Sequence, residues 1–138
     1  MTYITKLACG IILITIPTIE YGGYFLLTIL SGKQSELGLT PFQQAMFRAG
    51  HAHAGSIVIL SLICQLLTDY AVLPVGLQWL VRIGIPISAL LVSGGFFGAA
   101  AGKNVTQPTK LVIFVYAGAG WLAVCLILLG VGLIRSNS

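Results

Sequence analysis

The sequence predicts an all-α integral membrane protein, a bundle of four transmembrane helices. Only 7% of its residues are charged and 57% are hydrophobic, whereas soluble domains have about 25% charged residues. Four apolar stretches are long enough to cross a bilayer as helices, which takes about 20 residues each; they run approximately over 4–30, 42–67, 77–101 and 109–134. Little of the 138-residue chain is left over, so we expect a single transmembrane domain, 1–138.

The first helix is expected to begin near Thr2 and to end at Ser31-Gly32, because glycine is a common helix stop. Pro17 lies inside it and predicts a kink. The apolar stretch is too long for the core of a cleavable signal peptide. A short polar connection over 32–39 follows, so the first two helices are expected to run antiparallel.

The second helix has a clear start signal. Thr40-Pro41-Phe42-Gln43 places a capping threonine before a proline and a glutamine, the pattern of a capping box. The helix is expected to run to about residue 67. The segment Thr68-Asp69-Tyr70 is then expected to return to water.

The third helix is expected to start near Pro74 or Gly76. Trp79 and Arg82 follow at the depth where aromatic and cationic side chains anchor a helix at the membrane surface. Pro86 predicts a kink in the same helix.

Small residues recur in the second half of the third helix. Gly94, Gly98 and Gly102 are four residues apart, a spacing that lets helix backbones approach closely in membranes. We expect this face to pack on another helix of the chain or on a neighbouring subunit. The fourth helix is expected to begin after Pro108, with Lys110 at the membrane surface.

Charge and cysteine content argue against several other classes. The net charge is +4, but the seven cations are spread over the helix ends and form no basic stripe, so nucleic acid is not an expected partner. The expected partners are the lipid bilayer and further copies of the chain or other membrane subunits. Cys9, Cys64 and Cys125 lie in three different apolar stretches without a C-x-x-C spacing, which predicts packing residues rather than a thiolate metal site.

The segment Arg48-Ala49-Gly50-His51-Ala52-His53-Ala54-Gly55 contains both histidines of the chain. Titratable side chains inside a membrane are costly and are functional candidates by default. Glu20 lies eleven residues before Ser31, and His51 lies eleven residues after Thr40. Because a helix rises about 1.5 Å per residue, both lie roughly 16 Å inside the same end of the bundle. The spacing therefore predicts that Glu20 and His51 are neighbours.

Other polar side chains are expected to support this pair. Arg48 precedes His51 by one helical turn, and hydroxyl groups at compatible depths are those of Tyr21, Tyr24, Tyr116, Ser88 and Ser93. An alternative interpretation is that the Glu–His–Arg cluster only holds the first two helices together, since hydrogen bonds inside membranes contribute modestly to helix association.

His51 and His53 point about 200° apart on a regular helix, so they do not readily bind the same ion. Three arrangements remain open. One histidine faces Glu20 while the other faces a subunit interface, or the helix is distorted near Gly50 or Gly55, or one histidine binds a ligand and the other bonds to a backbone carbonyl.

Two segments carry a resemblance to known proteins. Ile11–Gly22, which ends in Pro17-Thr18-Ile19-Glu20-Tyr21-Gly22, and Phe47–Gly55 resemble uncharacterised small four-span membrane proteins of bacteria, actinobacteria among them. The resemblance covers nearly the whole chain and implies the four-span architecture in a bacterial inner membrane, but no activity. Gly50-His51-Ala52-His53 alone is similar to histidine segments of the haem-copper oxidase core subunit, whose further histidines are missing here.

Three functions compete on these observations. The preferred hypothesis is a metal or haem site, serving redox or proton chemistry, with His51 or His53 as a ligand of haem b or of Cu, Fe or Zn, and with Glu20 as a further ligand or as a supporting partner of the histidine. Two ligand groups per chain are too few for a closed site, so it requires an oligomer. The alternatives are a small proton or ion transport subunit and a non-catalytic scaffold. An enzyme acting on lipids with His53 as base ranks below these, because no nucleophile is visible.

Overall fold

The computed structural model describes residues 1–32 and 38–136, which fold into four long helices and one short 3-10 helix. These are α1 (Tyr3–Leu30), α2 (Pro41–Thr68), α3 (Val75–Ala99), η2 (Lys110–Val112) and α4 (Ile113–Arg135). All four long helices are long and apolar enough to cross a membrane. The predicted all-α class is confirmed, and the predicted spans differ from the observed ones by at most two residues when η2 is counted with α4. Residues 33–37 of the predicted polar connection lie outside the described residues.

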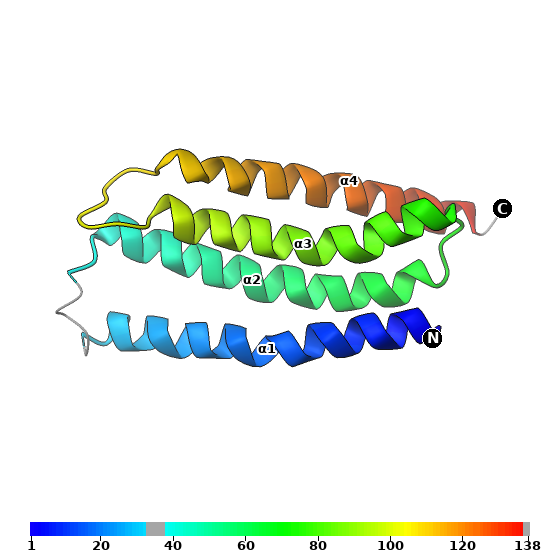
Figure 1. Ribbon diagram of the computed structural model, residues 1–138, viewed down its shortest axis with the longest axis horizontal. Coiled ribbons are helices and arrows are strands. Elements are labelled where there is room, and N and C mark those ends of the chain that lie inside the picture. The colour runs from blue at the N-terminus through cyan, green and yellow to red at the C-terminus, as the bar shows by residue number, and fades with distance from the viewer. Residues whose placement is uncertain (33–37, 137–138) are drawn as a thin grey trace.

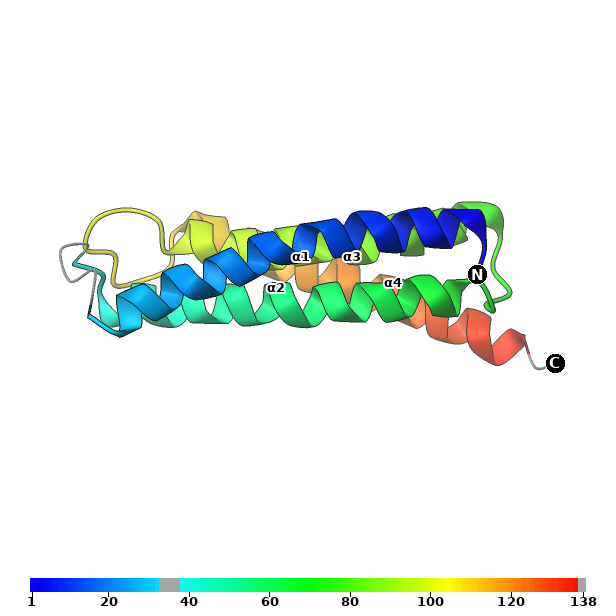
Figure 2. The same ribbon diagram turned by 90° about the horizontal axis from the view of Figure 1, so that it is seen from below.

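The helices follow one another antiparallel, so that the start of α1 and the end of α4 lie at the same end of the bundle (Figure 1). The helix α3 is central and packs against both α2 and α4, whereas α1 packs mainly against α2 (Figure 1). In the view from below, α1 lies next to α2 and in front of α3 (Figure 2). Half of the residues in the most apolar stretch of α3 are buried, compared with 11% in the corresponding stretches of α1 and of α4. The outer faces of α1 and α4 are therefore not covered by the other helices of the chain.

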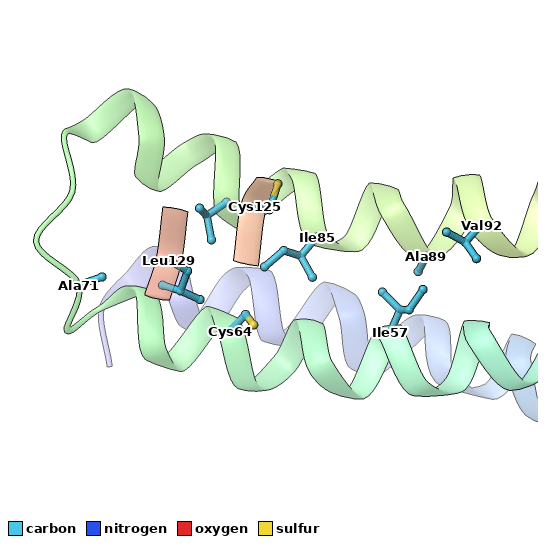
Figure 3. Packing of buried hydrophobic residues seen from close by; sticks show 9 residues of the cluster. Ile57, Cys64, Ala71, Ile85, Ala89, Val92, Cys125 and Leu129 are labelled. Atoms are coloured by element: carbon cyan, nitrogen blue, oxygen red, sulfur yellow. The ribbon is translucent and has the colours of Figure 1, made fainter. Parts of the chain in front are cut away.

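The hydrophobic core lies between α2, α3 and α4 (Figure 3). Ile57 and Cys64 of α2 meet Ile85 of α3, and Cys125 and Leu129 of α4 complete the cluster. Cys64 and Cys125 are buried free thiols, which agrees with the prediction that the cysteines serve packing.

The predicted starts of α1 and α2 are both present. The Thr2 hydroxyl accepts a hydrogen bond from the Thr5 amide at the start of α1. At the start of α2, Thr40 and Gln43 form the complete capping box, with both bonds at 3.1 Å. The Gln43 amide also donates to the carbonyls of Ala100 and Gly102 at 2.9 Å each. Gln43 thereby links the start of α2 to the end of α3.

Close contact between α3 and α4 depends on glycines, but not on the predicted ones. A Cβ on Gly95 would lie 2.6 Å from the backbone nitrogen of Val115, and one on Gly118 would lie 2.8 Å from Leu91 Cβ. Both distances are too short for a side chain to be accommodated. Gly95 and Gly118 therefore set the separation of the two helices.

Gly94, Gly98 and Gly102 do not form one packing surface within the chain, and packing of this face on a neighbouring subunit stays a prediction. Gly98 faces η2, since its Cβ would lie 3.2 Å from Leu111 Cδ1, whereas a Cβ on Gly94 would meet no atom within 4 Å. Gly102 follows the end of α3 with φ +126°, a backbone conformation that favours glycine. Because α3 ends before Gly102, the four-residue spacing does not continue as one helical stripe.

Candidate functional site: Glu20 and His51

Glu20 and His51 line the same cavity, of about 220 Å³, between α1 and α2. The rest of the lining is apolar or small: Ile16, Ile19, Gly55, Val58 and Ile59. His51 is half-buried and Glu20 is exposed, so the cavity opens on the outer face of the bundle. The two side chains flank the cavity without a direct ion pair. The site thus consists of one carboxylate and one imidazole on facing helices, with room for a small group between them.

Two glycines of α1 make room for the His51 ring. A Cβ on Gly23 would lie 3.0 Å from His51 Nε2, and one on Gly22 would lie 3.7 Å from His51 Nδ1. The imidazole therefore lies directly against the α1 backbone, one turn after Glu20. The sequence Glu20-Tyr21-Gly22-Gly23 thus supplies both the acid and the space for its partner.

His53 points to a different part of the bundle. Its Nδ1 donates a hydrogen bond of 2.7 Å to the carbonyl of Ala49. Its ring stacks on Phe96 of α3, with 5.0 Å between centroids and 30° between planes. The histidines therefore lie against different helices, His51 against α1 and His53 against α3, as the two-residue spacing on a regular helix requires.

The structure does not bring the other predicted polar groups to this cavity. Arg48 is exposed, and Tyr21, Tyr24 and Tyr116 are 73%, 65% and 67% exposed. None of these four is among the described residues that line the cavity. Matched depth along a bundle does not determine rotation about a helix axis, and rotation turns these side chains outward.

A buried ion pair at the other end of the bundle was not foreseen. Arg82 Nη2 donates to Asp69 Oδ1 at 2.6 Å, and the two side chains are only 6% and 8% exposed. Arg82 Nη1 donates to Thr5 Oγ1 at 2.9 Å and to Gln65 Oε1 at 3.0 Å. The prediction that Asp69 returns to water is therefore wrong for its side chain, which is enclosed together with that of Arg82. The tight turn between α2 and α3 and the start of α1 enclose both groups.

Hydrogen bonding keeps Asp69 ionised. Desolvation raises the pKa of this carboxyl, but bonds from the Thr5 hydroxyl, the Thr2 amide and hydroxyl, and Arg82 outweigh it. The net pKa of Asp69 lies well below its usual range. The ion pair is thus a structural link between the ends of α1, α2 and α3.

Pro86 explains why Gln65 belongs to this cluster. A proline has no N–H to offer the carbonyl four residues earlier, which here is that of Arg82. The Gln65 amide donates to this carbonyl at 2.6 Å. A glutamine inside the apolar part of α2, together with a proline four residues after Arg82, is the sequence signal that would have pointed to this contact.

Other chemistry at the candidate site is limited by the residues present. Over 1–32 and 38–136, no three side chains of His, Cys, Asp or Glu are grouped so that they could hold a metal ion.

The chain matches no family model, and comparisons with curated proteins and with solved structures find no similar protein.

Proposed function

We propose that this protein is a small proton-transport subunit of a bacterial inner membrane, in which Glu20 and His51 take up and release a proton. The observation that carries the proposal is that both side chains line one cavity within the membrane-spanning region. Histidine changes its charge near neutral pH. Glutamate and histidine placed together inside membranes are typical of proton pathways.

The geometry favours exchange of a proton over a static ion pair. Glu20 is exposed towards the lipid, where a lone carboxylate is costly. Passing a proton between Glu20 and His51 keeps the pair neutral overall. Since a water molecule occupies about 30 Å³, a cavity of about 220 Å³ can hold the few waters needed to connect the two groups.

The test is proton flux into liposomes that contain the purified protein and a pH-sensitive dye, driven by a potassium diffusion potential. We expect Glu20→Gln and His51→Gln to lower the flux at least tenfold. His53→Gln is the matched control, because it removes the other imidazole of the same helix and should leave the flux unchanged. Equal flux in all four proteins would reject the proposal.

A metal or haem site is the second candidate, and it is favoured by one observation at His53. The bond from Nδ1 to the Ala49 carbonyl leaves Nε2 as the unprotonated nitrogen, which is how many metal-binding histidines are oriented. One chain offers too few ligands for a closed site. A haem b or a Cu, Fe or Zn ion would therefore be held by His53 residues of two copies in an oligomer.

Purified protein distinguishes the candidates by its visible spectrum and metal content. A haem absorption band or stoichiometric metal that disappears in His53→Ala and remains in His51→Ala supports the second candidate. Colourless, metal-free protein rejects it. If neither histidine affects flux, spectrum or metal content, the remaining interpretation is a scaffold subunit.

A further inference from the structure

A second and larger cavity, of about 410 Å³, lies between α1, α2 and α3. Ile19 and Val58 line both this cavity and the one with Glu20 and His51, so they form the wall between the two. Buried residues of the lining are Ile12, Ser61, Ala89 and Ser93, and exposed ones are Ile11, Thr15, Thr18, Leu90 and Gly94. Glu20 and His51 do not line this second cavity.

The cavity opens sideways towards the bilayer. The helix α1 packs on α2 and not closely on α3, so no helix closes the side of the cavity between α1 and α3. The exposed members of the lining lie on α1 and α3, in the middle of two helices long enough to span the membrane. A molecule that enters here must come from the hydrocarbon region, where only apolar compounds are abundant.

The Ser93 hydroxyl is the one polar group of the lining that lacks a partner in the described part of the chain. Ser93 is 7% exposed, and its Oγ makes no hydrogen bond. The hydroxyls of Thr15, Thr18 and Ser61 instead donate to carbonyls of their own helices, at 2.6, 2.6 and 2.7 Å. A buried hydroxyl without a partner is unfavourable, so a ligand that accepts from Ser93 removes a cost already present.

We propose that this cavity binds a lipid-soluble molecule that has an apolar chain and a carbonyl group, with Ser93 donating to the carbonyl oxygen. The apolar walls and the sideways opening select the chain. The lone hydroxyl selects a neutral acceptor, because a charged group would have no counter-charge among the lining residues. An isoprenoid quinone and a fatty acyl ester share this chemistry. The proposal does not depend on proton exchange at Glu20 and His51.

A larger side chain at position 94 can fill the cavity. A Cβ there would meet no atom within 4 Å, so a larger side chain extends into open space at the cavity instead of clashing with a helix. Gly94→Leu should therefore fill the binding volume while the bundle still folds. Gly120→Leu is the matched control, since Gly120 also has no atom within 4 Å of its Cβ position and does not line the cavity.

The experiment uses the full chain in nanodiscs made of ether-linked lipids, which contain no ester carbonyl. Two probes are added separately, a prenylated naphthoquinone and methyl palmitate, each with a ¹³C-labelled carbonyl, and hexadecane serves as the carbonyl-free competitor. Infrared spectroscopy reports hydrogen bonding as a shift of the labelled carbonyl band to lower frequency, and equilibrium dialysis gives the affinity. The quinone and the ester arms distinguish the two sources.

We expect at least one probe to show the shifted band in the wild-type protein. Ser93→Ala should abolish the shift and weaken binding about fivefold, the effect of one net hydrogen bond. Ser88→Ala should change neither, because Ser88 is also buried but donates to the Gly84 carbonyl of its own helix and does not line the cavity. Gly94→Leu should weaken binding at least tenfold, and Gly120→Leu should leave it unchanged.

Three results would overturn the proposal. One is the absence of a shifted carbonyl band for both probes in the wild-type protein. Another is a band and an affinity that Ser93→Ala leaves as they were. The third is displacement of either probe by an equal concentration of hexadecane, which would mean that the cavity takes any hydrocarbon and that the carbonyl is not recognised.

Discussion

Gln65 donates its side-chain amide to the backbone carbonyl of Arg82 at 2.6 Å, the acceptor that Pro86 leaves without its usual helical partner. The same glutamine accepts a hydrogen bond from the Arg82 guanidinium at 3.0 Å. One side chain of α2 thus bonds both to the carbonyl that Pro86 leaves free in α3 and to a buried charge, and links this part of α3 to the Asp69–Arg82 ion pair.

Replacing Gln65 by leucine is expected to lower the free energy of unfolding by about 2–4 kcal/mol, since two buried polar groups lose their partner. Adding Pro86→Ala should recover about 1 kcal/mol, because the restored N–H can bond to the Arg82 carbonyl. Denaturation in detergent measures both values. Gln78→Leu is the control, since its amide bonds only to the Leu73 carbonyl in the α2–α3 turn; equal losses for Gln65→Leu and Gln78→Leu would contradict the account.

Acid should weaken the bundle through Asp69. Its pKa is lowered in the folded protein, so its contribution to stability is complete above the ordinary aspartate pKa of about 3.9 and is lost as the pH falls towards the folded value. The wild-type unfolding temperature in detergent should therefore fall as the pH drops below about 4. Asp69→Asn should be less stable at pH 7, by about 3–5 kcal/mol if the Arg82 charge is left unpaired.

The Asp69→Asn protein should also show a smaller loss of stability on acidification, because it no longer has this carboxyl to protonate. A wild-type protein and an Asp69→Asn protein with parallel pH profiles would show that other groups are responsible. Glu20→Gln is the comparison for an acid outside the ion pair.

Gly23→Ala is expected to displace the His51 ring, because the added Cβ would lie 3.0 Å from Nε2. The imidazole ¹⁵N signals of His51 should shift, while the imidazole ¹⁵N signals of His53 should not. Proton flux should fall. Gly10→Ala on the same helix is the control, since its Cβ would meet no atom within 4 Å. Unchanged His51 signals in Gly23→Ala would show that the ring does not lie against α1.

Gly95→Ala should separate α3 from α4. Its Cβ would fall 2.6 Å from the backbone nitrogen of Val115, and an overpacked contact of this kind costs about 1–3 kcal/mol. Gly120→Ala adds the same methyl group where no atom lies within 4 Å and should be neutral or slightly stabilising, because alanine favours helix. Thermal unfolding of the two variants in the same detergent gives the comparison, and equal unfolding temperatures would contradict the assigned packing role.

Local sequence signals and the distribution of apolar residues determined the helices of this protein. Stretches of apolar residues predict four helices whatever their packing, and the Thr40–Gln43 capping box forms from neighbours in the sequence. The connection of α1 to α2 also limits Glu20 and His51 to similar depths, because rise per residue is a property of the helix alone.

Only the tertiary structure decided which side chains meet. Rotation about each helix axis turned Tyr21, Tyr24 and Tyr116 outward and placed His51 against Gly23, and nothing in a single helix specifies that rotation. The folding back of α3 on α2 buried Asp69 with Arg82, although each residue alone is typical of a membrane surface. Burial of a charge depends on a partner brought from elsewhere in the chain, and pairing of that kind arises when the helices pack.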